Sequence, residues 1–197
     1  MSVLKVVKYG EQVLRTPAKE VHKISKKIRA LIHDMVDTMY AQNGVGLAAP
    51  QVGESLRIFV IDVTDPDDTP NPIVFVNPKI VKKSGAVNSY EGCLSFPDAF
   101  TNVRRYSDVT VKALDINGKP FILEGKNGTL LARAIQHEFD HLEGILFVDH
   151  SRNRFEADQE LAKKGLLPIE ADKLIEENEL EEMIAQQEAA KKEEQKA

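Results

Sequence analysis

The pentapeptide His-Glu-Phe-Asp-His at residues 137–141 constrains this chain more than any other feature of its sequence. The surrounding segment, residues 129–143, predicts a helix, because residues that cap helices precede it and a glycine follows it. Histidines four positions apart on a helix project from one face, so His137 and His141 can bind the same metal ion. Glu138 lies close enough to take a proton from a water at that metal. The pattern therefore predicts a hydrolytic metal centre rather than polar decoration of a half-buried helix.

A catalytic metal of this kind usually has three protein ligands and one open position. The continuation found in metzincin proteases fails here, because Phe147 stands where their third histidine lies. The downstream acids Glu156 and Glu160 could serve in another class of peptidase, but no ligand motif surrounds them. A better candidate lies upstream, where Cys93 follows Gly92, a residue that permits a close approach of the backbone.

Cys93 is the one cysteine of the chain, so it cannot form an intrachain disulfide, and nothing suggests an oxidising compartment. A lone cysteine is more often a small core residue than a metal ligand. Beside a His-Glu-x-x-His motif that lacks its third ligand, the ligand interpretation becomes the stronger one.

The segment Gly44–Gly53 contains too much glycine and proline for a regular element, so we expect an irregular loop. It lacks a lysine and the spacing of a phosphate-binding loop. Its one polar side chain is Gln51, whose amide could stabilise an oxyanion. The alternative is a tight buried turn in which Gln51 satisfies backbone groups.

The remaining pattern predicts helices and short strands. Apolar residues at helical spacing predict a helix over 22–40, and runs rich in valine and isoleucine predict strands, with Asn117-Gly118 as a hairpin turn. The expected strands are 56–63, 73–76, 79–83, 108–114 and 121–124, and further helices are expected at 154–164 and 168–190. A helix followed by strands and then helices favours an α+β fold over alternating βαβ units.

The net charge of −5 belongs to the end of the chain. Residues 1–150, which we interpret as the folded catalytic domain, hold 18 basic and 18 acidic residues, whereas residues 151–197 hold 8 and 13. An acidic chain is a poor candidate for gripping nucleic acid through phosphates, so we expect no direct DNA binding. Neither a signal peptide nor an apolar run of membrane-spanning length is present, so we expect a cytoplasmic protein with no membrane association.

Three motifs together resemble the signatures of the peptide deformylases. They are GVGLAAPQVG at 44–53, EGCLS at 91–95 and QHEFDHLEG at 136–144. The opening segment around Tyr9-Gly10 also resembles the family, and the likeness covers residues 1–150. It implies an α+β fold with mixed or antiparallel sheets around a central helix that bears the histidines, and residues 151–197 would add an acidic, largely helical extension with a disordered end.

The resemblance also implies roles for individual residues. Cys93, His137 and His141 would bind one Fe²⁺ ion per chain, with Zn²⁺ or Ni²⁺ able to substitute, and Glu138 would be the general acid and base. Gln51 and the backbone N–H of Leu94 would stabilise the oxyanion.

Further positions would surround the substrate. The backbone of Gly46 would contact the formyl group or main chain of the substrate. Four residues are expected to form an apolar pocket for the methionine side chain: Val45, Leu47, Leu130 and Ala134. For some of these four, the alternative is that they are simply core residues. Glu91 would be a structural acid at the site, paired with Arg105 or, as the alternative, Arg104. Arg133 would face solvent or a substrate carbonyl, and His22, His33 and His150 are expected to be ordinary surface or helix residues.

The implied reaction removes the formyl group from the N-terminal methionine of newly made proteins and releases formate. The implied partners are formyl-methionyl nascent peptides and the ribosome near its exit tunnel, approached by a monomer. Two other interpretations stay open: a peptidase of another class with an acid as third ligand, and a non-enzymatic metal-binding or ribosome-docking protein. Intact Glu138 and Gln51 argue against the second, because a structural metal needs neither.

Overall fold

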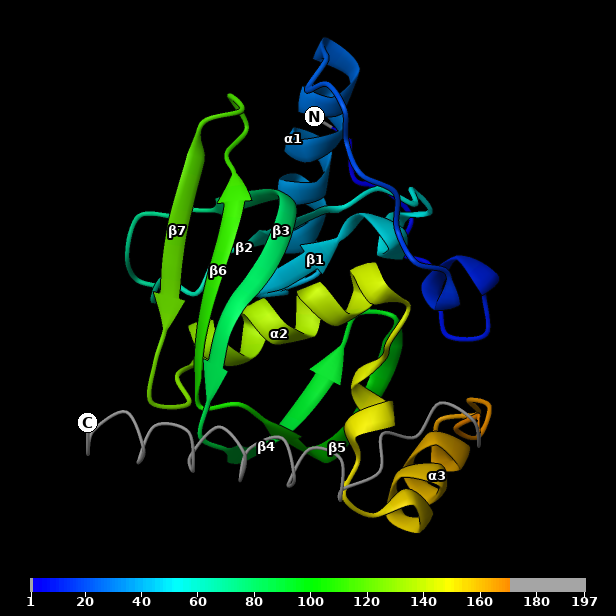
Figure 1. The fold of residues 1–197 in the computed structure, drawn as a ribbon. Helices are drawn as coiled ribbons and strands as arrows, with labels where there is room; N and C mark the ends of the chain where they lie inside the picture. The colour runs from blue at the N-terminus through cyan, green and yellow to red at the C-terminus, as the bar shows by residue number, and fades with distance from the viewer. Residues whose placement is uncertain (1, 171–197) are drawn as a thin grey trace, which may run out of the picture.

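The computed structural model describes residues 2–170, which form two antiparallel sheets and three α-helices (Figure 1). The larger sheet has the order β1 (Gly46–Ala48), β2 (Ile58–Ile61), β3 (Ile73–Ser84), β6 (Asp108–Leu114), β7 (Pro120–Gly125). A separate hairpin pairs β4 (Val87–Cys93) with β5 (Phe96–Arg105). The helices are α1 (Lys26–Ala41), α2 (Leu130–Glu143) and α3 (Arg154–Lys163). The predicted α+β class is confirmed.

Strand β2, between β1 and β3, explains how two helices share one sheet. Its side chains alternate between faces, so Phe59 and Ile61 join the core under α2, whereas Ile58 and Val60 join the core under α1. All four are fully buried, and burying one such phenylalanine contributes roughly 1.5–3 kcal/mol. Helix α2 therefore rests on one face of the sheet, with the β4–β5 hairpin on its other side (Figure 1).

The predicted helix that carries the histidines is confirmed as α2. The hydroxyl of Thr129 accepts a hydrogen bond from the N–H of Ala132, and Gly144 ends the helix with a left-handed φ of 72°. The earlier helix begins at Lys26 rather than at residue 22, because the Ser25 side chain accepts a bond from the N–H of Ile28 and sets the start.

Three expectations about strands need correction. Part of the segment 44–53 is regular: Gly46–Ala48 forms β1 and Ala49–Val52 a 3₁₀ turn, because the backbone of β1 pairs with β2. The predicted strands 73–76 and 79–83 are one strand, β3, which continues through an irregularity at Asn77, whose side chain bonds both backbone groups of Val21. The hairpin β4–β5 was not expected, because its polar first strand lacks a run of valine and isoleucine.

The chain after residue 150 continues to pack on the same body. Ala157 and Leu161 of α3 and then Ile169 are almost fully buried and share a core cluster with Leu14 and Phe147. Most of the helical stretch expected at 168–190, and the end of the acidic extension, lie outside the described residues.

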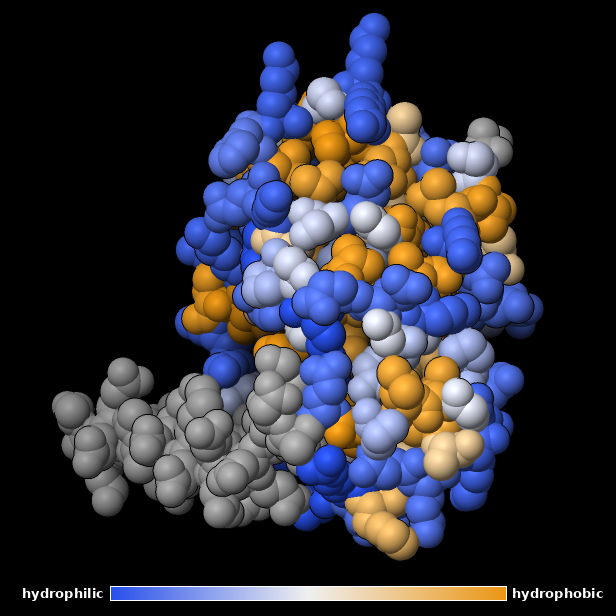
Figure 2. All heavy atoms as spheres, turned by 90° about the vertical axis from the view of Figure 1, so that its right-hand side faces the viewer, coloured by the Kyte–Doolittle hydropathy of each residue, from blue (hydrophilic) through white to orange (hydrophobic). Residues whose placement is uncertain are grey.

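The face in Figure 2 shows apolar side chains in separate groups between polar ones. Within residues 2–170, no helix is both long enough and apolar enough to cross a membrane.

Candidate metal centre

Cys93, His137 and His141 converge on one point of the structure. Cys93 ends strand β4 and the two histidines lie on α2, and one ligand atom from each lies within 4.8 Å of the other two. The Sγ of Cys93 is 3.3 Å from the Nε2 of His141. Ligand atoms of a tetrahedral site with bonds of about 2.0–2.3 Å are separated by about 3.3–3.8 Å, so the cluster fits a metal ion with little adjustment. A thiolate with two imidazoles suits zinc or iron better than calcium or magnesium.

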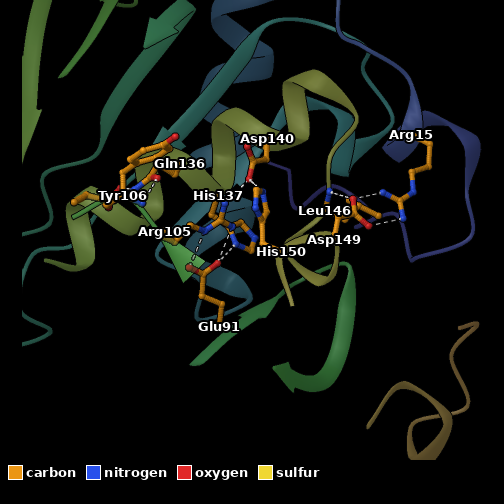
Figure 3. Close-up of polar contacts among 11 residues, drawn as sticks. Arg15, Glu91, Arg105, Tyr106, Gln136, His137, Asp140, Leu146, Asp149 and His150 are labelled. Atoms are coloured by element: carbon orange, nitrogen blue, oxygen red, sulfur yellow. Dashed lines mark hydrogen bonds and ion pairs between the residues drawn. The ribbon is translucent and has the colours of Figure 1, made fainter. Parts of the chain in front are cut away.

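Glu91 holds His137 in the orientation that a ligand needs (Figure 3). Its Oε2 lies 2.9 Å from the Nδ1 of His137, so Nδ1 carries the proton and Nε2 is free for the metal. Both carboxylate oxygens also accept from Arg105, at 3.0 and 2.9 Å, which settles the choice between Arg105 and Arg104. Burial is the largest influence and raises the pKa of Glu91, but the charge of Arg105 and the hydrogen bonds with His137 and Arg105 together outweigh it and hold the pKa below its ordinary range.

Arg105 extends this network to a second acid, Asp140 on α2. Its remaining amino group donates to Asp140, and the Nε2 of His150 lies 2.9 Å from the same carboxylate (Figure 3). Burial raises the pKa of Asp140, yet the charges and hydrogen bonds of Arg105 and His150 together lower it to about 2. His150 was expected to be an ordinary surface or helix residue: it does end a 3₁₀ turn, but its side chain is largely buried rather than at the surface, because it bonds to Asp140 of α2. Sequence reasoning did not single out Asp140, although it lies inside the motif.

Gln51 is buried, with its two amide atoms engaged on different sides. Its Oε1 accepts from the N–H of Ala48 at 2.8 Å, which satisfies the backbone of the turn. Its Nε2 points towards the metal cluster, 3.3 Å from the Sγ of Cys93 and 3.4 Å from the Oγ of Ser95. The N–H of Ser95 also lies 3.4 Å from that sulfur. The sulfur of Cys93 therefore faces polar groups on the side of the cluster.

Glu138 is buried beside the cluster against Gly46. A Cβ at position 46 would lie 2.4 Å from the Oε1 of Glu138, so only glycine leaves room for this carboxyl group. Its other oxygen is buried with no hydrogen-bond partner among residues 2–170. Burial is the largest influence and raises the pKa of Glu138 to about 7. A carboxyl group with such a pKa and an unpaired oxygen is suited to exchanging protons near neutrality.

A cavity of about 500 Å³ opens beside the cluster and runs along α2 from Glu138 back to Leu130. Val45, Leu130 and Ala134 line it, as predicted for the methionine pocket. Leu47 does not: it is fully buried in the core under α1, because alternation along β1 turns its side chain to the opposite face of the sheet. Gly46, Gln51, Glu91 and Leu94 also border the cavity.

Comparison with known proteins identifies the family. A family model described as polypeptide deformylase matches residues 3–156. The chain belongs to this family. Peptide deformylase 1 of Clostridium perfringens is 49% identical over 140 residues, which are 71% of this chain and 92% of that protein. The peptide deformylase of Dictyoglomus turgidum is 47% identical over 149 residues, 76% of this chain and 93% of that protein.

Solved structures give the same result. A peptide deformylase from Synechococcus elongatus, in complex with actinonin, superposes with a TM-score of 0.79 at 41% identity, covering 89% of this chain and 91% of its own. The enzyme from Legionella pneumophila gives a TM-score of 0.75 at 46% identity, covering 82% and 95%. Family membership makes this chain a metal-dependent hydrolase of the deformylase type, acting on N-formylated peptides.

Proposed function

We propose that Cys93, His137 and His141 hold one metal ion and that Glu138 moves the protons by which a formyl-methionyl peptide is hydrolysed. The observation that carries this proposal is the convergence of three metal-ligating atoms within 4.8 Å, beside a buried carboxyl group with one unpaired oxygen. A metal ion bound there, Fe²⁺ by resemblance to the family and replaceable by Zn²⁺ or Ni²⁺, supplies Lewis-acid polarisation of the formyl carbonyl and acidifies water.

Glu138 performs the proton transfers. Its carboxylate accepts a proton from the water that attacks the formyl carbon, and its raised pKa keeps that proton available. As the C–N bond breaks, the acid passes the proton to the nitrogen of the methionine. One water and one formamide thus give formate and a free amino group, and Glu138 returns to its starting state.

Two donors stabilise the negative charge that develops on the formyl oxygen. The Nε2 of Gln51 is held at the cluster because its own carbonyl is tied to the backbone of Ala48. The N–H of Leu94 borders the same cavity, directly after Cys93. Donors fixed before the reaction need no reorganisation when charge appears, which is why such groups lower the barrier.

The substrate's methionine side chain occupies the part of the cavity bordered by Val45, Leu130 and Ala134. The backbone of Gly46 contacts the formyl end. Glu91 borders the cavity too, but Arg105 and His137 occupy its oxygens, so it acts by orienting the ligand rather than by touching the peptide.

We propose further that the enzyme is a cytoplasmic monomer that meets its substrates near the ribosomal exit tunnel, because formyl groups occur on nascent chains. The acidic extension, residues 151–197, would be repelled by RNA and would favour basic ribosomal proteins.

The test is a formate assay with formyl-Met-Ala-Ser and anaerobically purified, iron-loaded protein. Glu138→Gln should lose about 10²–10⁴-fold in kcat while its metal content is unchanged. Cys93→Ala should lose both metal and activity. Formate at equal rates from wild type and Glu138→Gln, or none at all from wild type, would overturn the proposal. Activity that survives in Cys93→Ala would instead support a peptidase with an acid as third ligand.

A further inference from the structure

The segment that joins α1 to β1, residues 42–45, forms part of the border of the cavity. All four of its residues line the cavity, and none of them belongs to a helix or strand. Asn43 has a left-handed φ of 54°, which is uncommon for a residue other than glycine. Such a conformation persists where the surrounding structure holds it. The position of this cavity wall therefore depends on what fixes the two ends of the segment.

Asp62 holds both ends. On the helix side, the hydroxyl of Tyr40, in the last turn of α1, donates to the Oδ2 of Asp62 at 2.5 Å. On the strand side, the N–H of Asp62 donates to the carbonyl of Val45 at 2.9 Å. This second bond lies one position beyond the last β1–β2 pair, which is Gly46 with Ile61. One residue thus ties the end of a helix to the start of a strand, with the cavity wall between them.

Asp62 is itself fixed, so it can serve as an anchor. The residue is buried, its Oδ1 accepts from the N–H and the hydroxyl of Thr64, and its Oδ2 also accepts from the N–H of Asn71 at 2.8 Å. Burial raises the pKa of Asp62, but the hydrogen bonds from Thr64, Tyr40 and Asn71 together hold it below its ordinary value. Without the hydroxyl of Tyr40, the carboxylate would keep the donors of Thr64 and Asn71. Removing that hydroxyl should therefore leave the fold intact.

The tie acts on the pocket wall rather than on the reacting groups. Val45 is 43% exposed, so burial in the core does not hold its side chain in place. A Cβ at Gly44 would lie 2.9 Å from the Cδ1 of Leu94, so the segment already packs closely on this side and can move only away from it. Glu138 lies on α2, and Gly46 is held by its own pairing in β1. Loss of the tie would thus displace Val45 and leave the proton-transferring carboxyl group where it is.

We propose that Tyr40 and Asp62 are positioning residues that hold Val45 at the wall of the methionine pocket. The proposal rests on the function proposed above, since it takes Val45 as part of the pocket for the first side chain. It deepens that function by naming two residues that do not border the cavity themselves and yet determine how well that side chain fits.

The experiment measures formate released from formyl-Met-Ala-Ser and from formyl-Ala-Ala-Ser by the metal-loaded enzyme. In Tyr40→Phe, KM for the methionine substrate should rise about tenfold, the lower end of what one lost methylene contact is worth in an apolar pocket. Its kcat should be unchanged, because Glu138 is not displaced. KM for the alanine substrate should equal that of wild type, because a methyl group offers too little side chain to depend on Val45.

Tyr9→Phe is the matched control. It removes a hydroxyl that donates to the carbonyl of Pro168 at 3.1 Å, and Tyr9 does not border the cavity, so both substrates should behave as with wild type. In an Asp62→Ala background, Tyr40→Phe should raise KM no further, because its acceptor is already gone. If Asp62→Ala does not fold, the comparison of the two substrates in Tyr40→Phe decides the matter alone.

Three results would overturn the proposal. They are an unchanged KM for the methionine substrate in Tyr40→Phe, an equal rise in KM for both substrates, and a further rise when Tyr40→Phe is added to Asp62→Ala. The second result would assign the hydroxyl to the stability of the fold as a whole. A failure of the proposed function looks different, because wild type would then release no formate.

Discussion

Two buried arginines lie on either side of the metal centre and do different work (Figure 3). Arg105, whose side chain is 2% exposed, joins Glu91 of β4 to Asp140 of α2, and Glu91 in turn holds His137. Arg15, at 8%, pairs with the buried Asp149 and, at 3.7 Å, with the exposed Glu170, and Asp149 also accepts from the N–H of Leu146. The first network ends on a proposed metal ligand, whereas the second joins the N-terminal segment to the turn after α2.

The pKa values of the acids show the difference. Burial raises the pKa of both aspartates, but Arg105 and His150 together lower that of Asp140 to about 2, whereas Asp149 keeps a raised pKa despite Arg15. Removing charges from water is costly in both places, and ion pairs of this kind are weak evidence for stability. We infer that the Arg105 network serves to orient the proposed metal ligand His137. The Arg15–Asp149 pair serves to attach the N-terminal segment to the turn after α2.

The largest effect should come from Arg105→Met. It leaves Glu91 and Asp140 as uncompensated buried charges, so the free energy of unfolding should fall by about 3–5 kcal/mol. The metal content of the remaining folded protein should also fall, because His137 loses its fixed orientation. Urea unfolding and metal analysis of the same sample measure both. Full metal occupancy in the variant would contradict the proposed role of the network.

Arg15→Met should come next, with a loss of about 3 kcal/mol, since only one buried acid loses its cation and that acid, Asp149, keeps a backbone donor, whereas the other partner, Glu170, is exposed. The metal content per folded molecule should equal that of wild type. This variant is the matched control for Arg105→Met: a similar loss of metal in both would show that the two arginines do not differ.

Glu91→Gln should affect the metal more than the fold. The glutamine amide can donate to the Nδ1 of His137, which would place the proton on the nitrogen that must bind the metal. Metal affinity should fall by about 10–100-fold, as for other partners of metal-bound histidines. Competition with a chelator measures it. An unchanged affinity would mean that Glu91 serves Arg105 only.

His150→Leu should have the smallest effect. Asp140 loses one hydrogen-bond partner but keeps Arg105, so the expected loss of stability is about 1 kcal/mol, measured by urea unfolding. Metal affinity should not change. A decrease comparable with that of Glu91→Gln would show that orientation of the ligand depends on the whole network and not on Glu91 alone.

The sequence by itself determined the parts of the site that follow from local periodicity. The caps and apolar spacing of α2 gave its limits almost to the residue, and the distance of four positions placed His137 and His141 on one face. These features depend on backbone geometry within one helix, so distant residues do not alter them. The three motifs also placed Cys93 and Gln51 at the site.

Tertiary structure alone decided which strands pair and which side chains of each strand face the site or the core. Antiparallel pairing of β4 with β5 brings Cys93 to α2, and the polar sequence of β4 gave no sign of it. Alternation along β5 turns Arg105 rather than Arg104 towards Glu91, and alternation along β1 sends Leu47 into the core. A strand has no fixed inner face until its partners are set, which is why these choices belong to the assembled fold.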